Sequence, residues 1–114
     1  MTQQIGDYNQ WTGYVKTAGA TYAMSLQDRF VYAQAVANGD FVITLPSVAD
    51  AKGLLFVIHD FVAIYSKTYT ITCDGSDMII YIGGLSATFI LNAHNEYCIL
   101  YSNGSHWIII GAKH

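Results

Sequence analysis

The stretch from Tyr97 to Ile110, YCILYSNGSHWIII, most constrains this chain, because it has the sequence form of a β-hairpin without a polar face. Asn103 and Gly104 suit the two positive-φ positions of a type I′ turn between two apolar runs. Successive residues of such a hairpin point to opposite faces. One face carries Cys98, Leu100, Trp107 and Ile109, and the other carries Tyr97, Ile99, Tyr101, His106, Ile108 and Ile110.

A hairpin in a small soluble protein normally has one face in water, so something must cover the second apolar face here. The turn pairs Tyr101 with His106 and Leu100 with Trp107. We expect the face with Leu100 and Trp107 to look into the domain, although the pattern alone leaves the reverse assignment open. The other face is the predicted oligomer interface, and it consists of Tyr97, Ile99, Tyr101, His106, Ile108 and Ile110.

From residue 20 onward, short runs rich in Val, Ile, Thr, Tyr and Phe alternate with turn compositions. No run shows a sustained helical period. The spacing of the runs predicts a single all-β domain over residues 20–114, a compact antiparallel β-sandwich or a jelly-roll-like domain. The runs before the hairpin are DFVITLP (40–46), GLLFVIHDF (53–61), TYTITC (68–73), DMIIYI (77–82) and SATFIL (86–91).

Charged residues are scarce in this chain. They make up 11% of the 114 residues while hydrophobic residues make up 53%, against about 25% charged residues in typical soluble domains. So much apolar surface favours a permanent partner, and oligomerisation is the simplest source of one. A net charge of −3 with scattered basic residues argues against nucleic acid as a partner.

The sequence shows neither a membrane span of about 18 apolar residues nor the regions of a signal peptide. We therefore expect folding in a cytosol, without membrane insertion. Cys73 and Cys98 lie in strand-like runs and have no CxxC or Cys/His spacing. Two buried thiols are the expected state, because cytosolic proteins seldom keep disulfides.

The first 19 residues differ from the rest in composition. They contain three glycines and isolated aromatic residues at Tyr8, Trp11 and Tyr14. An extended arm that docks on a neighbouring protein would use aromatic residues as separate anchors in this way. The alternative is a terminus whose aromatic residues tuck back onto the domain.

No arrangement of residues predicts catalysis. His59 and Asp60 are neighbours in a strand-like run, so their side chains point to opposite faces. Asp74 and Asp77 in CDGSD have a spacing found in calcium loops, but the further oxygen ligands and the distal Glu are missing. A turn capped by its own Asp side chains is the expected structure. The sequence thus predicts no catalytic residue, no metal site and no cofactor.

Exposed aromatic rings also bind sugars by stacking, which requires no sequence motif. The residues with this potential include Tyr65, Tyr81 and the loop around His94. The alternative is that these side chains belong to the core or to a subunit interface.

Three stretches in succession resemble a module of bacteriophage and related viral tail fibres, spikes and head-decoration proteins. They are residues 25–60 with ITLP, residues 68–79 with TYTITCDGSDMI, and residues 96–111 with EYCILYSNGSHWIIIG. The family pattern has an ITLP strand, a TIT strand before an acidic-Gly turn, and a closing SDGSxWxxIG hairpin. This chain departs from it in SNGS and in the aromatic segment 61–69.

The resemblance implies a homotrimeric virion structural protein that folds in the host cytoplasm. The short chain with its own first Met favours a capsid cement or decoration protein, or a short head or tail fibre. It would bind sister subunits and capsid or tail proteins, with the N-terminal arm docked on the particle. The alternative function is a carbohydrate-binding module for host recognition, with a host surface glycan as partner.

Overall fold

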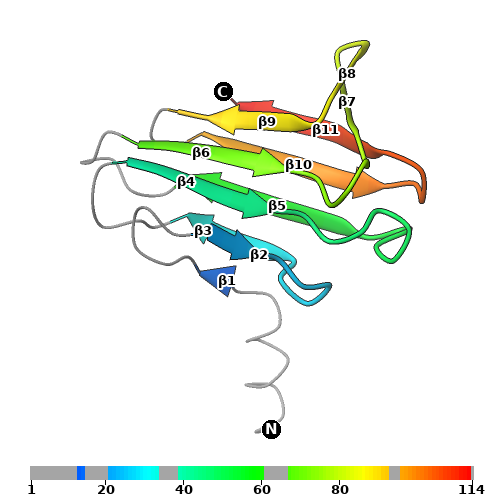
Figure 1. Ribbon diagram of the computed structural model, residues 1–114, viewed down its shortest axis with the longest axis horizontal. Helices are drawn as coiled ribbons and strands as arrows, with labels where there is room; N and C mark the ends of the chain where they lie inside the picture. The colour runs from blue at the N-terminus through cyan, green and yellow to red at the C-terminus, as the bar shows by residue number, and fades with distance from the viewer. Residues whose placement is uncertain (1–12, 15–20, 34–38, 61–66, 93–95, 114) are drawn as a thin grey trace, which may run out of the picture.

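The computed structural model describes residues 13–14, 21–33, 39–60, 67–92 and 96–113. Within these ranges the chain forms strands and turns only, which confirms the all-β prediction. The strands build two sheets that face each other in a compact body (Figure 1).

The larger sheet has seven strands and the smaller has four. In spatial order the seven-stranded sheet consists of β1 (Gly13–Tyr14), β3 (Phe30–Ala33), β5 (Leu55–Asp60), β10 (Tyr97–Ser102), β11 (Trp107–Lys113), β7 (Ile79–Tyr81) and β8 (Gly84–Ser86). The four-stranded sheet consists of β2 (Thr21–Ala23), β4 (Gly39–Thr44), β6 (Lys67–Thr72) and β9 (Thr88–Leu91).

From β1 to β6 the chain crosses to the opposite sheet after every strand. Consecutive strands in the sequence therefore do not pair, and strands two apart pair in parallel. The N-terminal half is thus a flattened coil. The antiparallel expectation does not describe this half, because a period-two pattern shows which face a residue occupies and not the direction of the neighbouring strand.

The C-terminal half supplies the antiparallel pairs. β9 pairs with β6 in the smaller sheet, and β10 lies between β5 and β11 in the larger one. β7 then joins β11 in parallel and turns back as β8. Both sheets are therefore mixed.

The β10–β11 hairpin forms, but with a four-residue loop in place of the predicted two-residue turn. The Asn103 side chain accepts hydrogen bonds from the backbone N–H groups of Ser105 and His106, both at 2.8 Å. Ser102 then pairs with Trp107, and the predicted pairs Tyr101–His106 and Leu100–Trp107 are wrong. Between the loop and the bulge the shift in register is two residues, so the paired side chains keep their predicted faces, whereas His106 moves into the loop.

A bulge follows in β11. Leu100 pairs with Ile109 and Ile99 pairs with Gly111, which leaves Ile110 without an opposite residue. The extra residue lets Ala112 continue the inward side of the strand, where it packs against the core.

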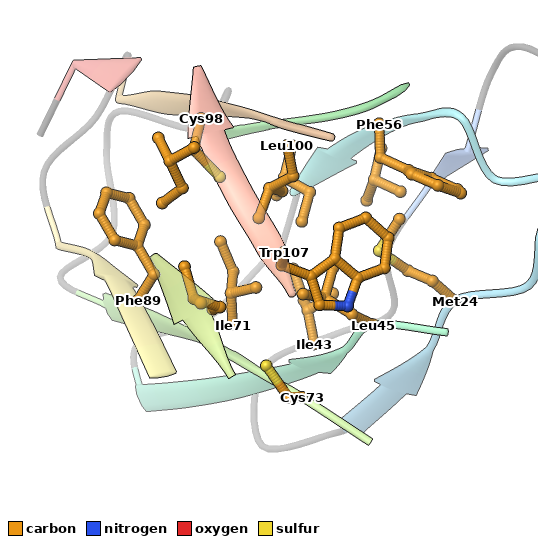
Figure 2. Close-up of a cluster of buried hydrophobic side chains, with 14 of the residues drawn as sticks. Met24, Ile43, Leu45, Phe56, Ile71, Cys73, Phe89, Cys98, Leu100 and Trp107 are labelled. Atoms are coloured by element: carbon orange, nitrogen blue, oxygen red, sulfur yellow. The ribbon is translucent and has the colours of Figure 1, made fainter. Parts of the chain in front are cut away.

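The face with Leu100 and Trp107 looks into the domain, as expected. Trp107 is completely buried and meets the Phe56 ring edge-on at 5.4 Å. Figure 2 shows Trp107 between Phe56 of its own sheet and Ile43 and Leu45 from the opposite side. The buried core also includes Val31, Phe41, Ile58, Tyr69, Ile71, Ile79, Phe89, Leu91, Cys98 and Ile109.

One buried polar side chain connects the hairpin to the turn between β4 and β5. The Ser102 hydroxyl donates a hydrogen bond of 2.6 Å to the carbonyl oxygen of Val48. The Ser102 carbonyl oxygen accepts a second bond from the Gly53 N–H at 2.8 Å. These bonds hold the connection from one sheet to the other against the end of the hairpin.

We predict that Trp107→Ala lowers the free energy of unfolding by about 3–5 kcal/mol, since it removes the largest fully buried side chain. Thr70→Ala, on the outer side of β6, should lower it by about 1 kcal/mol or less. Urea unfolding measures both values. A Trp107→Ala protein as stable as the Thr70→Ala protein would contradict the inward placement of the indole.

Candidate functional site: the outer face of the seven-stranded sheet

The side of the seven-stranded sheet that points away from the smaller sheet is mostly apolar. We call it the outer face. Lys113, the last residue of β11, is in register with Tyr97 at its border, and none of the other described residues that form it is Asp, Glu, Lys or Arg. They are Phe30, Leu55, Val57, His59, Ile80, Leu85, Tyr97, Ile99, Tyr101, Ile108 and Ile110.

Strand register arranges these residues in rows across the sheet. The longest row crosses five strands, from β5 through β10, β11 and β7 to β8. Its members in that order are Leu55, Tyr101, Ile108, Ile80 and Leu85. A second row holds Phe30, Val57 and Ile99. The apolar surface is therefore continuous across most of the sheet.

Besides Tyr101, a third row carries the polar side chains of the outer face. His59 stacks on Tyr97 with ring centroids 6.4 Å apart and an angle of 15° between the rings. Tyr32 is in register with His59 on one side, and Lys113 is in register with Tyr97 on the other. Aromatic side chains with a polar tip are enriched in protein interfaces, and His59 and Tyr97 supply such groups at one border of the face.

The outer face has no covering layer among the described strands, because they form two sheets only (Figure 1). Ile110 and Leu85 are 58% and 59% exposed, and most other members are half-buried by their own neighbours. Parallel strands such as β3 and β5 normally have both sides covered. The chain therefore presents a large apolar surface of the kind that proteins bury against a partner.

The outer side of the four-stranded sheet has a different chemistry. Thr68, Thr70 and Thr72 of β6 point outward while Tyr69 and Ile71 are buried, as the alternation in TYTITC predicts. Thr44 and Thr88 flank Thr72 in register. Val42 and the exposed Ile90 flank Thr70 in the next row, so this side mixes hydroxyl groups with single apolar residues.

Five of the six residues of the predicted oligomer interface lie on the outer face. His106 belongs instead to the loop of the hairpin, where its N–H bonds to Asn103. The side of the sheet was predicted correctly for these five residues, although the register was wrong, because the register error in the paired strands is an even number of residues. The five residues are Tyr97, Ile99, Tyr101, Ile108 and Ile110.

Several predicted binding residues lie outside the described ranges, namely Tyr8 and Trp11 of the arm and Tyr65 and His94 of the glycan group. Tyr14, also assigned to the arm, is in β1 and pairs with Tyr32 at the edge of the sheet. Tyr81 packs edge-on against Phe89, with ring centroids 5.2 Å apart, so its ring contacts the core.

His59 and Asp60 point to opposite sides, as their adjacent positions predict. His59 is on the outer face, whereas Asp60 is 2% exposed in the interior. The backbone N–H of Asp60 donates to the Glu96 carbonyl oxygen at 2.8 Å, which makes these two residues cross-strand neighbours. Glu96 is also buried and its carboxylate accepts a hydrogen bond of 2.7 Å from the Asn92 N–H.

Sequence reasoning missed this pair of buried carboxyl groups. Glu96 directly precedes an apolar strand and Asp60 ends one, but only the pairing of β5 with β10 brings them together. Among the described residues, no cluster of three or more His, Cys, Asp or Glu side chains is placed to hold a metal ion.

The CDGSD segment forms a turn, as expected. The Asp77 N–H donates to the Asp74 carbonyl oxygen at 3.1 Å, and the Asp77 carboxylate accepts a hydrogen bond of 2.9 Å from the Val48 N–H. Asp77 therefore holds the β4–β5 connection, which is a structural role for this side chain.

Both cysteines are buried free thiols, in agreement with the prediction. Burial raises the pKa of Cys98 to about 12. Burial, and secondly the negative charge of Asp77, raises the pKa of Cys73 to about 11. Since the thiolate is the reactive form, neither thiol is suited to nucleophilic chemistry at neutral pH.

Comparison with protein-family models, with curated proteins and with solved structures finds no match to this chain. Within the described part of the chain, no helix has the length and apolar character that crossing a membrane requires.

We expect Asp77→Ala to lower the free energy of unfolding by about 1–3 kcal/mol, because the partly buried Val48 N–H loses its acceptor. Asp77→Asn keeps an acceptor oxygen and should be milder. Thermal unfolding with and without added Ca²⁺ provides the control. A clear rise in Tm with Ca²⁺ that both substitutions abolish would show a metal site in place of a structural turn.

Because the pKa values of both thiols are raised in the folded protein, we predict that the protein becomes less stable in alkaline solution. Between pH 9.0 and about 11 the folded protein keeps thiol protons that the unfolded chain releases. The free energy of unfolding should therefore fall as the pH rises through this range. Urea titrations at several pH values measure the slope, and Cys98→Ala should make it shallower. An equal slope in the variant would refute the assignment of this effect to Cys98.

Proposed function

We propose that this chain is a virion structural protein that assembles as a homotrimer through the outer face of the seven-stranded sheet. The observation that carries the proposal is the continuous row from Leu55 to Leu85, which is apolar across five strands. The resemblance of about residues 20–111 to a module of viral fibres, spikes and decoration proteins supplies the biological class and the trimeric state.

Copies of the same chain are the partner that fits the outer face best. Apart from Lys113 at its border, the described part of the face lacks Asp, Glu, Lys and Arg, so it has little charge with which to select a charged partner. Apolar surfaces associate in proportion to the area that they remove from water, about 25 cal/mol per Å² before the entropy of association is subtracted. In a closed symmetric assembly each copy covers the face of its neighbour, so no apolar surface is left on which further copies could assemble.

In this proposal the assembled domain attaches to a capsid or tail as a cement or decoration protein, or as a short fibre. The function is adhesion and requires no chemical step. The N-terminal residues, with Tyr8, Trp11 and Tyr14, would dock on the particle. Support comes from β1, since the Gly13–Tyr14 strand places the end of that segment at one edge of the outer face.

The oligomeric state tests the proposal. Analytical ultracentrifugation of the intact chain at micromolar concentration should give a trimer. Ile108→Asp should dissociate it into folded monomers, because it places a charge in the apolar interface. Trp107→Asp should instead unfold the domain, and Thr70→Asp on the opposite side should leave the trimer intact. A monomeric wild-type protein would refute the proposal.

Removal of residues 1–12 tests the docking role and leaves β1 in place. The shortened chain should still fold and trimerise but should fail to attach to the particle in a cosedimentation assay. Full attachment would exclude the arm as the docking element. A glycan array gives the complementary result, since an adhesive structural protein should show no saccharide signal and the carbohydrate-binding alternative requires one.

A further inference from the structure

The hairpin of β7 and β8 has an apolar residue at a position where the backbone disfavours it. Ile82 and Gly83 form the tip, with φ values of 47° and 77°. Both values are positive, as a type I′ turn requires, and Asn or Gly is the usual residue at the first position. A β-branched side chain is a clear outlier in the left-handed region.

The described part of the chain leaves the Ile82 side chain uncovered. The residue is 84% exposed, the largest exposure among the large hydrophobic residues of the described ranges. Figure 1 shows the β7–β8 hairpin projecting beyond both sheets. Strained residues persist where the strain has a function, so an exposed and strained isoleucine at a projecting tip indicates a contact with another molecule.

The base of the hairpin is held firmly. Tyr81, next to the tip, packs edge-on against Phe89 of β9 at 5.2 Å. At the other end the Ser86 hydroxyl donates to the Thr88 carbonyl oxygen at 2.9 Å and accepts from the Thr88 N–H at 3.2 Å. The tip is thus presented by an anchored support, as an interface anchor requires.

The hairpin also continues the outer face. Leu85 of β8 is 59% exposed and pairs with Ile80, which in turn pairs with Ile108. The stretch from Met78 to Leu91 contains no charged residue and no histidine. Lipid headgroups and nucleic acid are therefore poor partners, because both attract basic side chains.

We infer that the β7–β8 hairpin is a clasp that inserts Ile82 into a second copy of this chain in the assembly. This inference rests on the proposed function, because continuity with the outer face is what identifies the second copy as the partner. The strain at Ile82 is offset only in the assembled state, where the side chain leaves water.

Ile82→Asn separates this role from folding, since Asn-Gly is a preferred type I′ sequence. In the dissociated background of Ile108→Asp, adding Ile82→Asn should leave Tm unchanged or raise it. In the otherwise wild-type chain, Ile82→Asn should weaken trimer formation by about tenfold or more in sedimentation equilibrium. Leu26→Asn, at an exposed apolar residue in another turn, is the matched control and should have no effect.

The outcomes distinguish the two proposals. A wild-type trimer whose affinity is unaffected by Ile82→Asn would overturn the clasp and leave the outer-face interface standing. A wild-type monomer would refute the interface, and the clasp with it. A fall in Tm of the monomeric background would show that Ile82 serves folding. Binding of wild-type protein, but not of Ile82→Asn, to uncharged phosphatidylcholine vesicles would assign the tip to a lipid surface instead.

Discussion

The packing of the two inner faces against each other is the interaction on which this structure depends. Strands of both sheets contribute alternate side chains to that layer, and Trp107 packs edge-on against Phe56 within it. Because alternation is strict along β5 and β10, filling the interior also fixes what points outward. The same strands that bury Phe56 and Leu100 must therefore present Val57 and Ile99 on the other side. An apolar outer face and a well-filled core are two results of one set of strands.

The sequence was sufficient to predict the all-β class, the strand-forming runs from residue 40 onward and the faces of TYTITC and of the hairpin, since these depend on local composition and on the period-two pattern. It did not assign the short strands β1, β2, β3 and β8. It was insufficient to predict strand direction. TYTITC shows which residues of β6 are buried, but the same alternation would fit an antiparallel or a parallel neighbour. Pairing of β4 with β6 depends on the chain crossing between sheets after each strand, and this path is set by packing across the whole domain. The hairpin has a four-residue loop and not the predicted two-residue turn, because the Asn103 side chain accepts hydrogen bonds from the backbone N–H groups of Ser105 and His106. Such local side-chain bonds compete with a tight turn of the backbone.

The candidate site was predictable to a similar extent. The alternating pattern identified the residues that the hairpin contributes to the outer face, because a register shift of two residues leaves each side chain on the same side of the sheet. The contributions of Leu55, Val57 and Leu85 could not be found, since they depend on which strands become neighbours. The sequence also could not predict that Asp60 and Glu96 are neighbours or that the backbone at Ile82 is strained. The first requires the β5–β10 pairing, and the second is a backbone property that residue type argues against.

The coil formed by β1 to β6 has a consequence for how such chains can vary in length. Each turn of the coil contributes one strand to each sheet and pairs with the turns on either side, and the last turn also pairs with β9 and β10. Insertion or loss of a whole turn would lengthen or shorten both sheets together without altering the faces of the remaining strands, as in solenoid proteins. Loss or gain of half a turn, a single strand, would send the next strand to the wrong sheet. The antiparallel strands β9 to β11 end this repetition, so the chain combines an extensible segment with a fixed terminus.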